Sequence, residues 1–182
     1  MTGVPTIVSL SVAASENDVI GADGALPWYI PEDLRRFRAL TTGHAVVLGR
    51  LTHESIVARL GRPLPGRTSV VLSSRAAEPG TAEPGTAHGG VAWAGSLAAA
   101  MATARAAETA GEVFVLGGAS VYEQALPEVD RVYLTRVHRA VAGDTSMPAG
   151  WLDGFTLVGR DDRPGDGADG GFSFLDYERR PG

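Results

Sequence analysis

The stretch HAVVLGRLT, residues 44–52, decides the fold, because an apolar strand pattern runs into a glycine and then directly into a helix start. The same layout returns in VFVLGGAS, residues 113–120. Each junction would aim free backbone N–H groups and the positive end of a helix at one point, which suits an anion. For either junction alone, the alternative is that glycine merely lets the chain turn. Two junctions at the carboxyl ends of strands predict a site for a long phosphate-bearing ligand such as a dinucleotide.

Strand and helix patterns alternate along the rest of the chain. Strand-like runs rich in Val, Ile and Leu occupy residues 6–14, 44–49, 67–73, 112–118, 131–137, 155–160 and 171–180. Helix-like segments occupy residues 31–40, 50–60, 96–108 and 119–126. The alternation predicts an α/β fold with parallel crossovers, and the last two strands, separated by a Gly/Asp-rich loop at 161–171, predict an antiparallel hairpin. We therefore expect one domain, residues 1–182, with a mixed sheet. The tandem AEPGT repeat at 77–86 predicts a surface loop.

Composition excludes several classes of protein. The 182 residues contain 44% hydrophobic and 20% charged residues, which is typical of a globular chain. The absence of cysteine excludes disulfides and thiol catalysis. A formal net charge of −5 argues against nucleic-acid binding, so an anionic ligand would need local arginines. No run approaches the length of a membrane span and no secretion signal is evident, so we expect no membrane association and a cytoplasmic protein.

A third strand end adds phosphate donors. The two junctions fit neither GxGxxG nor GxxxxGK[ST], so a different dinucleotide fold is needed. Ser73, Ser74 and Arg75 stand at the end of the strand-like run 67–73 and form a good donor set for a phosphate monoester. Arg50 and Arg75 together would suit the additional phosphate of NADP, although solvated surface arginines are the alternative.

Two adjacent acids, Glu32 and Asp33, begin the helix at residues 31–40. At about 100° per residue, Phe37 lies roughly 40° from Asp33, which places Asp33 inside the apolar arc. Glu32 lies about 100° away on the opposite side, where its charge suits the exposed first turn. Asp33 is therefore the inward acid; a simple helix cap or N-terminal charge is the alternative. A carboxylate that faces an apolar cleft requires a partner.

From about Ile7 to Arg179 the chain resembles dihydrofolate reductase. The matching stretches follow the family order: Val19-Ile20-Gly21, Leu26-Pro27-Trp28, Pro31-Glu32-Asp33-Leu34 with Phe37, Gly49-Arg50 with Thr52, residues 61–67, Leu72-Ser73-Ser74, Gly117-Gly118 with Val121-Tyr122, Thr135, and Gly143-Asp144-Thr145. The resemblance implies a mixed, mostly parallel eight-stranded sheet flanked by four helices. It also implies hydride transfer from NADPH to 7,8-dihydrofolate, yielding tetrahydrofolate for one-carbon and thymidylate metabolism.

The resemblance also implies residue roles. Asp33 would bind the pteridine edge and direct a proton to the ring nitrogen, and a hydrogen bond from Thr135 would orient it; Leu26, Trp28 and Tyr122 complete the expected catalytic set. Residues 17–28 resemble a mobile lid, and the Gly117-Gly118 peptide is expected to be cis. The expected cofactor residues are Ala13, Ile20, Gly21, Gly24, Ala25, Gly49, Arg50, Leu51, Thr52, Leu72, Ser73, Ser74, Arg75, Gly117, Gly118, Ala119, Ser120, Val121, Tyr122, Gln124 and Thr145. The expected substrate residues are Ser11, Asp33, Leu34, Phe37, Ile56, Arg62, Leu64, Arg67, Leu116, Tyr122 and Thr135. For the apolar residues, core packing is the alternative.

Three features depart from the family pattern. His53 replaces a frequent tryptophan and is interpreted as a satisfied or solvated histidine, since no second histidine has metal-ligand spacing and no metal is expected. Ser11 would make the pocket floor more polar, and residues 57–60 resemble an insertion. By resemblance the partners are dihydrofolate, NADPH and antifolate inhibitors, and the protein is a monomer. One competing hypothesis is a related pyridine-nucleotide reductase of flavin or pterin biosynthesis, which shares the fold but would not need Asp33 together with Arg67. The other is a cofactor-binding module without catalysis.

Overall fold

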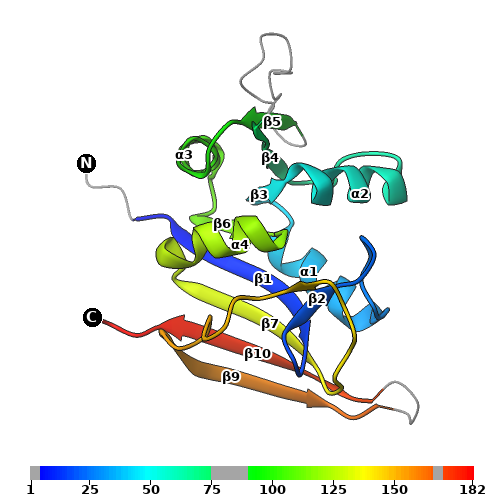
Figure 1. Ribbon diagram of the computed structural model, residues 1–182. Helices are drawn as coiled ribbons and strands as arrows, with labels where there is room; N and C mark the ends of the chain where they lie inside the picture. Colours follow the sequence, from blue (N-terminus) through cyan, green and yellow to red (C-terminus); the bar gives the residue numbers. More distant parts are fainter. Residues whose placement is uncertain (1–4, 75–89, 166–169) are drawn as a thin grey trace.

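The computed structural model describes residues 5–74, 90–165 and 170–182 (Figure 1). The elements of the N-terminal half are β1 (Ile7–Ser15), β2 (Val19–Gly21), α1 (Pro31–Thr41), β3 (Ala45–Gly49), α2 (Arg50–Leu60), β4 (Thr68–Leu72) and β5 (Val91–Ala94). Those that follow are α3 (Leu97–Ala107), β6 (Glu112–Val115), α4 (Ala119–Ala125), the 3-10 helix η2 (Leu126–Glu128), β7 (Arg131–Val137), β8 (Thr145–Ser146), β9 (Phe155–Arg163) and β10 (Phe172–Arg179). The four predicted helices are confirmed.

Eight of the strands form one mixed sheet in the order β5-β4-β3-β6-β1-β7-β10-β9. Neighbours from β5 to β7 pair in parallel, whereas β10 pairs antiparallel with both β7 and β9. The predicted sheet and its antiparallel C-terminal hairpin are thus confirmed. Chain order reverses next to β6, between β3 and β1, and this is the kind of position where α/β sheets bind ligands.

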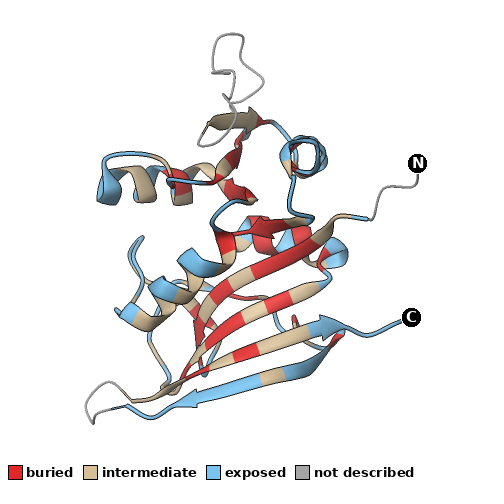
Figure 2. Ribbon diagram, turned by 180° about the vertical axis from the view of Figure 1, so that it is seen from behind, coloured by how far each residue is buried: buried red, intermediate tan, exposed pale blue. Residues whose placement is uncertain are grey.

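The helices divide between the two faces of the sheet because side chains alternate along each strand. Ala45 and Val47 on β3 belong to the apolar cluster that includes residues of α3 and α4. Val46 and Leu48 point the other way, into a second cluster that reaches Phe37 on α1 and Ile56 on α2. Burial is concentrated in the central strands and is lowest along the edge strand β9 (Figure 2). The α1 and α2 face therefore has the smaller apolar cluster.

The structure adds strands that the sequence patterns did not predict. β5 is a four-residue strand, and β2 pairs with β8 in a separate two-stranded sheet. β9 extends to Arg163, so the expectation that a loop begins at residue 161 was wrong. Pairing with β10 explains this extension, because Asp161, Asp162 and Arg163 lie opposite Phe174, Ser173 and Phe172. The AEPGT repeat lies outside the described residues. Within the described ranges, none of the helices is long and apolar enough to cross a bilayer.

Candidate active site

The two strand, glycine, helix junctions lie side by side in the structure. β3 and β6 are neighbours in the sheet, and Gly49 N–H donates a hydrogen bond of 2.7 Å to Gly117 O. The Gly117-Gly118 peptide is cis, as expected. A Cβ atom at Gly49 would lie 3.3 Å from Val121 Cγ2, so glycine permits the close approach of the two turns. The two junctions therefore lie at one place, as a single ligand that contacts both would require.

Both junctions leave helix N–H groups available. α2 follows Gly49 and α4 follows Gly118, and neither helix start has a side-chain cap among the described residues. Thr52 faces the second turn, since a Cβ atom at Gly118 would lie 3.5 Å from Thr52 Oγ1. Free N–H groups, a hydroxyl and space next to glycine fit the phosphates of a dinucleotide. These residues would hold NADPH if it binds at this edge of the sheet.

The other expected cofactor residues are spread around these turns. Arg50 begins α2, and its Nη1 donates to both carboxylate oxygens of Glu54 at 2.8 and 3.0 Å. Ser73 is buried and Ser74 exposed immediately after β4, while Arg75 lies outside the described residues. Gln124 donates to the Ser120 backbone oxygen and hydroxyl. Thr145 on β8 contacts the lid strand at Gly21. The remaining members keep their assignment as a prediction: Ala13, Ile20, Gly24, Ala25, Leu51, Leu72 and Ala119.

Asp33 lies on the first turn of α1 and points toward the sheet. The Thr135 hydroxyl on β7 donates a 2.6 Å hydrogen bond to Asp33 Oδ1, which confirms the predicted contact. Burial raises the pKa of Asp33, while the Thr135 hydrogen bond and the positive charge of Arg36 oppose that rise. The helix cap position is Ile30, and no side chain caps this helix start, so the alternative of a capping role for Asp33 is wrong. Glu32 instead forms an ion pair with Arg35 at 3.4 Å on the more exposed side.

Tyr122 packs against the second glycine turn. Its hydroxyl donates a 2.7 Å hydrogen bond to Ser11 O, and a Cβ atom at Gly117 would lie 2.9 Å from Tyr122 Cε2. Burial and the negative charge of Asp33 raise the pKa of Tyr122, so the phenol stays protonated and remains a donor. Tyr122 thus contacts Gly117 in the proposed cofactor turn, and its pKa responds to the charge of Asp33.

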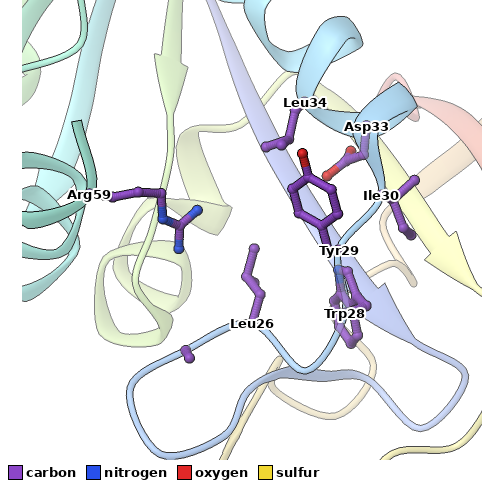
Figure 3. A pocket seen from close by; sticks show the side chains of 8 residues that line it. Leu26, Trp28, Tyr29, Ile30, Asp33, Leu34 and Arg59 are labelled. Carbon is purple, nitrogen blue, oxygen red and sulfur yellow. The ribbon is translucent and has the colours of Figure 1, made fainter.

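A cavity of about 270 Å³ opens between the lid segment, the start of α1 and the end of α2. Its walls are Ala25, Leu26, Trp28, Tyr29, Ile30, Asp33, Leu34 and Arg59. Figure 3 shows Tyr29, Asp33 and Leu34 together, with Arg59 reaching toward them from the opposite wall. Tyr29, Ile30 and Arg59 were missed in the sequence. The one available signal was for Arg59, which follows Ile56 by three residues and so shares its helix face.

Of the described apolar substrate candidates, Leu34 lines the cavity, and the other four belong to or pack against the second apolar cluster. Leu64 and Leu116 are buried in the second apolar cluster, and Phe37 and Ile56 pack against them. Leu34 is 38% exposed at the cavity, which leaves its side chain available to a ligand. Arg62 is exposed, and the structure does not bring it into the cavity.

Arg67 is held firmly against the C-terminal half of α1. Its side chain is buried, with Nε donating to Thr41 Oγ1 at 3.0 Å and Nη1 to Pro65 O at 2.7 Å. Its Nη2 makes a longer contact of 3.5 Å with Arg38 O, and its guanidinium lies 5.7 Å from the Phe37 ring. Burial and the neighbouring charge of Arg38 lower the pKa of Arg67, which nevertheless remains a permanent cation. Of its five N–H donors, two stay available for one carboxylate.

The predicted lid is anchored at its base and at its tip. Asn17 exchanges two hydrogen bonds with the backbone of Val141, at 2.9 and 3.0 Å. At the tip, Asp23 N–H donates to Asp144 Oδ2 at 3.0 Å. Asp23 and Gly24 both have positive φ, which forms the tight turn between Ala22 and Ala25. Hydrogen bonds from the Thr145 hydroxyl and from Asp23 N–H lower the pKa of Asp144. Motion of this segment stays a prediction.

The departures noted in the sequence have plain structural roles. His53 is buried with its ring edge-on to Trp93 at 5.6 Å, and burial lowers the pKa of His53, so it packs as a neutral side chain. Residues 57–60 form the last turn of α2, which ends at Gly61 with a φ of 71°. No group of three potential metal ligands occurs in the described part of the chain.

Replacing Asp33 with Asn should stabilise the fold at neutral pH. Because the pKa of Asp33 is raised on folding, the folded protein holds this proton more tightly than the unfolded chain does. The stability that the protonated Asp33 carboxyl contributes is therefore lost as the pH rises through the raised pKa. The asparagine amide can still accept the Thr135 hydrogen bond without a buried charge. We expect the Tm of Asp33→Asn to exceed that of the wild type by about 2–4 °C near pH 7, the change for roughly 1 kcal/mol. This difference in Tm between the variant and the wild type should shrink toward pH 5. A difference that widens there would contradict a raised pKa of Asp33 in the folded protein.

Comparison with known proteins identifies similar chains. The family model described as dihydrofolate reductase matches residues 7–179. "Dihydrofolate reductase HdrB" of Haloferax volcanii is 43% identical over 174 residues, which is 94% of this chain and 82% of that protein. "Dihydrofolate reductase type 3" of Salmonella typhimurium is 41% identical and spans 88% of this chain and 90% of its own length. The solved dihydrofolate reductase of Enterococcus faecalis, in complex with NADP(H) and RAB-propyl, superimposes with a TM-score of 0.78 at 30% identity and covers 96% of this chain and 97% of its own.

Proposed function

The chain belongs to the dihydrofolate reductase family, and from this membership and the geometry of the site we propose that it reduces 7,8-dihydrofolate to 5,6,7,8-tetrahydrofolate with NADPH, with Asp33 as the proton-directing acid. The observation that carries the proposal is the Asp33 carboxylate, oriented by Thr135 at the wall of the cavity. Tyr122 packs against Gly117 of the candidate cofactor turn, and the negative charge of Asp33 acts on its pKa. Tyr122 is thus the residue through which the charge of the acid acts next to the candidate cofactor turn.

Asp33 acts on the substrate through hydrogen bonds and charge. Its carboxylate accepts hydrogen bonds from the amidine-like edge of the pteridine ring, which provides the partner that a partly buried charge requires. This interaction favours protonation of the neighbouring ring nitrogen, which makes the adjacent carbon more electrophilic. When bound, NADPH supplies the hydride that this carbon accepts. The raised pKa of Asp33 brings its proton affinity closer to what such a role needs.

The residues around Asp33 position the rest of the substrate. Leu34, Phe37, Ile56 and Leu64 supply apolar surface for the aromatic parts. Arg67 has two free donors for the α-carboxylate of the glutamate tail. Along α1, Asp33 and the Arg67 partner Thr41 are separated by about 12 Å, so an elongated ligand would span both.

Turnover of the purified protein tests the proposal. NADPH absorbance should fall when dihydrofolate is added, with tetrahydrofolate as the product. The competing reductase of flavin or pterin biosynthesis would consume NADPH only with a different substrate, and a non-catalytic module would bind NADPH without consuming it. Absence of turnover in the wild type would reject the proposed function. Competitive inhibition by a diaminopyrimidine antifolate would support the same site.

The cellular setting is part of the proposal. We place the reaction in the cytoplasm and expect a monomer that needs no nucleic acid, metal or membrane partner. Support for the monomer comes from β9, the edge strand, where Arg160 pairs with Asp162 and Arg163 with Asp161. A charged edge discourages strand pairing between two copies. A sedimentation measurement of molecular mass checks this expectation.

Replacing Arg50 should change cofactor preference. Because Arg50 begins α2 next to the Gly49 turn, we assign its guanidinium to the phosphate that distinguishes NADPH from NADH. Arg50→Gln should raise the Kd for NADPH about tenfold, the effect of roughly one charge-assisted hydrogen bond, and leave the Kd for NADH near its original value. Loss of its exposed pair with Glu54 should cost little stability. An equal loss of affinity for both cofactors would contradict the assignment; Arg105→Gln on α3 is the charge-matched control.

A further inference from the structure

The Arg36 side chain is fixed between α1 and the strands of the sheet. Its Nη2 donates a hydrogen bond to Asp176 Oδ1 on β10, and the two groups form an ion pair. Its guanidinium also lies 4.6 Å from the centre of the Phe174 ring and 5.7 Å from that of the Tyr133 ring. The side chain is only 20% exposed. Arg36 therefore holds a positive charge at a defined place against the sheet, and the roles assigned above do not use it.

Asp33 lies against the same part of the sheet. It precedes Arg36 by three residues on α1, so the two side chains are neighbours on one helix face. Thr135 on β7 donates to Asp33, and Thr135 is paired directly with Phe174, the ring that Arg36 covers. Directly opposite residues of antiparallel strands share one face of the sheet, with Cβ atoms about 5 Å apart. The acid and the guanidinium thus contact adjacent positions on the sheet.

The charge of Arg36 acts on Asp33 without occupying its carboxylate. Burial raises the pKa of Asp33, and the hydrogen bond from Thr135 and the positive charge of Arg36 both act to lower it. Among the described residues, the direct ion pair of Arg36 is with Asp176 and not with Asp33. A carboxylate at an apolar cleft requires a favourable partner before any substrate arrives. Arg36 supplies that charge from one helical turn away and leaves the cavity side of Asp33 accessible.

The other ionisable groups that face Asp33 do not provide this charge. Tyr122 on α4 stays neutral, because burial and the charge of Asp33 raise the pKa of the phenol. Tyr29 and Arg59 line the cavity together with Asp33, but neither is among the groups that act on its pKa. Glu32, on the same helix, forms its ion pair on the more exposed side. In the described part of the chain, the guanidinium one turn along α1 is therefore the cation that supports the ionised acid.

We propose that Arg36 is a positioning residue for the reaction, which keeps the Asp33 carboxylate ionised and free for the pteridine edge. Asp176 and Phe174 complete this arrangement, because they hold the guanidinium on the sheet and prevent it from closing on the acid. The assignment rests on the proposed function of Asp33. Arg36 lies outside the residues that line the cavity, so it acts through the acid and not by contact with the substrate.

The protonation of Asp33 tests the assignment directly. Carboxyl-carbon NMR of aspartate-labelled protein follows it through a pH titration, and Asp33→Asn identifies the signal. In Arg36→Gln, the proton affinity of Asp33 should rise at least about threefold, the effect of one unit charge in water at the distance of one helical turn. Arg36→Lys should recover part of this change, because it retains the charge.

Two further variants separate charge from packing. Arg36→Met keeps an apolar contact with Phe174 and has no charge, so it should give the same rise even if glutamine at this position fails to fold. Arg163→Gln is the matched control, because the Arg163 guanidinium lies 5.7 Å from the same Phe174 ring. It should leave the proton affinity of Asp33 at its wild-type value. A rise of equal size in Arg163→Gln would overturn the inference.

Equilibrium binding of folate links the charge of Asp33 to the substrate. Quenching of tryptophan fluorescence gives the Kd for folate without turnover. The ratio of this Kd in Arg36→Gln to that in the wild type should rise from about pH 8 to about pH 5, because the variant loses the ionised acid first. A ratio that does not change with pH would overturn the inference.

The NMR titration also separates this inference from the proposed function. If the wild type does not reduce dihydrofolate, the proposed function fails, while the titration still decides whether Arg36 controls the charge of Asp33. An unchanged proton affinity of Asp33 in Arg36→Gln and Arg36→Met overturns the inference. A lower Tm in these variants would not rescue it, since Arg36 would then only support the packing of α1 on the sheet.

Discussion

Asp33→Asn should reduce kcat for dihydrofolate by about 10²–10⁴-fold near pH 7, the usual range for loss of a positioned acid or base. Asn keeps the hydrogen bond from Thr135 and the shape of the side chain, but it cannot carry the negative charge that favours protonation of the pteridine. Affinity for NADPH should stay within about twofold, because the glycine turns that would bind it do not use Asp33. Steady-state rates and a fluorescence titration with NADPH measure the two quantities separately.

The pH dependence of the same variant provides a second test. If the function of Asp33 is to bring a proton to the ring nitrogen, acid can supply it from solution, so the rate of Asp33→Asn should rise as the pH is lowered. Thr135→Val is the companion control, because it removes the orienting hydrogen bond and retains the carboxylate. It should lose less activity than Asp33→Asn. Loss of NADPH binding with retained kcat would show that the acid belongs to the cofactor site instead.

Arg67→Lys should raise the KM for dihydrofolate about 10²-fold, equivalent to roughly 3 kcal/mol for breaking a buried, hydrogen-bonded charge pair. Lys keeps the positive charge but cannot satisfy Thr41, Pro65 and a bidentate carboxylate at the same time. Since the carboxylate lies far from the reacting ring, the loss should appear mainly in KM.

Dihydropteroate is the matched control for Arg67→Lys, because it has no glutamate for the residue to bind. Its KM should change much less than that of dihydrofolate. A comparable rise for both substrates would mean that Arg67 supports the cleft structurally and does not bind the tail. The Tm of the variant distinguishes this case, since a collapsed Arg67 site would also lower stability.

Much of the fold follows from local pattern. The four helices show helical periodicity, and the strands of the central sheet show apolar runs, within their own segments of sequence. β5 has no such signal, because its sequence VAWA is too short and too mixed to indicate a strand. The segment is a strand because it pairs with β4. β2 and β8 depend equally on each other, since the pair joins segments that are far apart in the chain. Such strands are tertiary features that no window of residues contains.

The site divides in the same way. Helical angles alone select Asp33 over Glu32, and the structure confirms the choice through Thr135. The partner itself came from the family resemblance, because nothing in the sequence near residue 135 points to residue 33. Tyr29 and Arg59 were missed, since their importance depends on how α2 and the lid face each other across the cavity. That arrangement is set by packing on the sheet.

The lid segment is attached unequally along its length. Its base is fastened by the paired hydrogen bonds of Asn17, and Asp18 binds both Arg136 and the Trp151 indole. Its tip is held by contacts with residues 143–146 in a sheet of only two strands. The base is therefore held by more hydrogen bonds than the tip. We therefore expect the tip to detach before the base, so that a substitution of Asp144 should change the rate of product release without altering any group placed against the substrate.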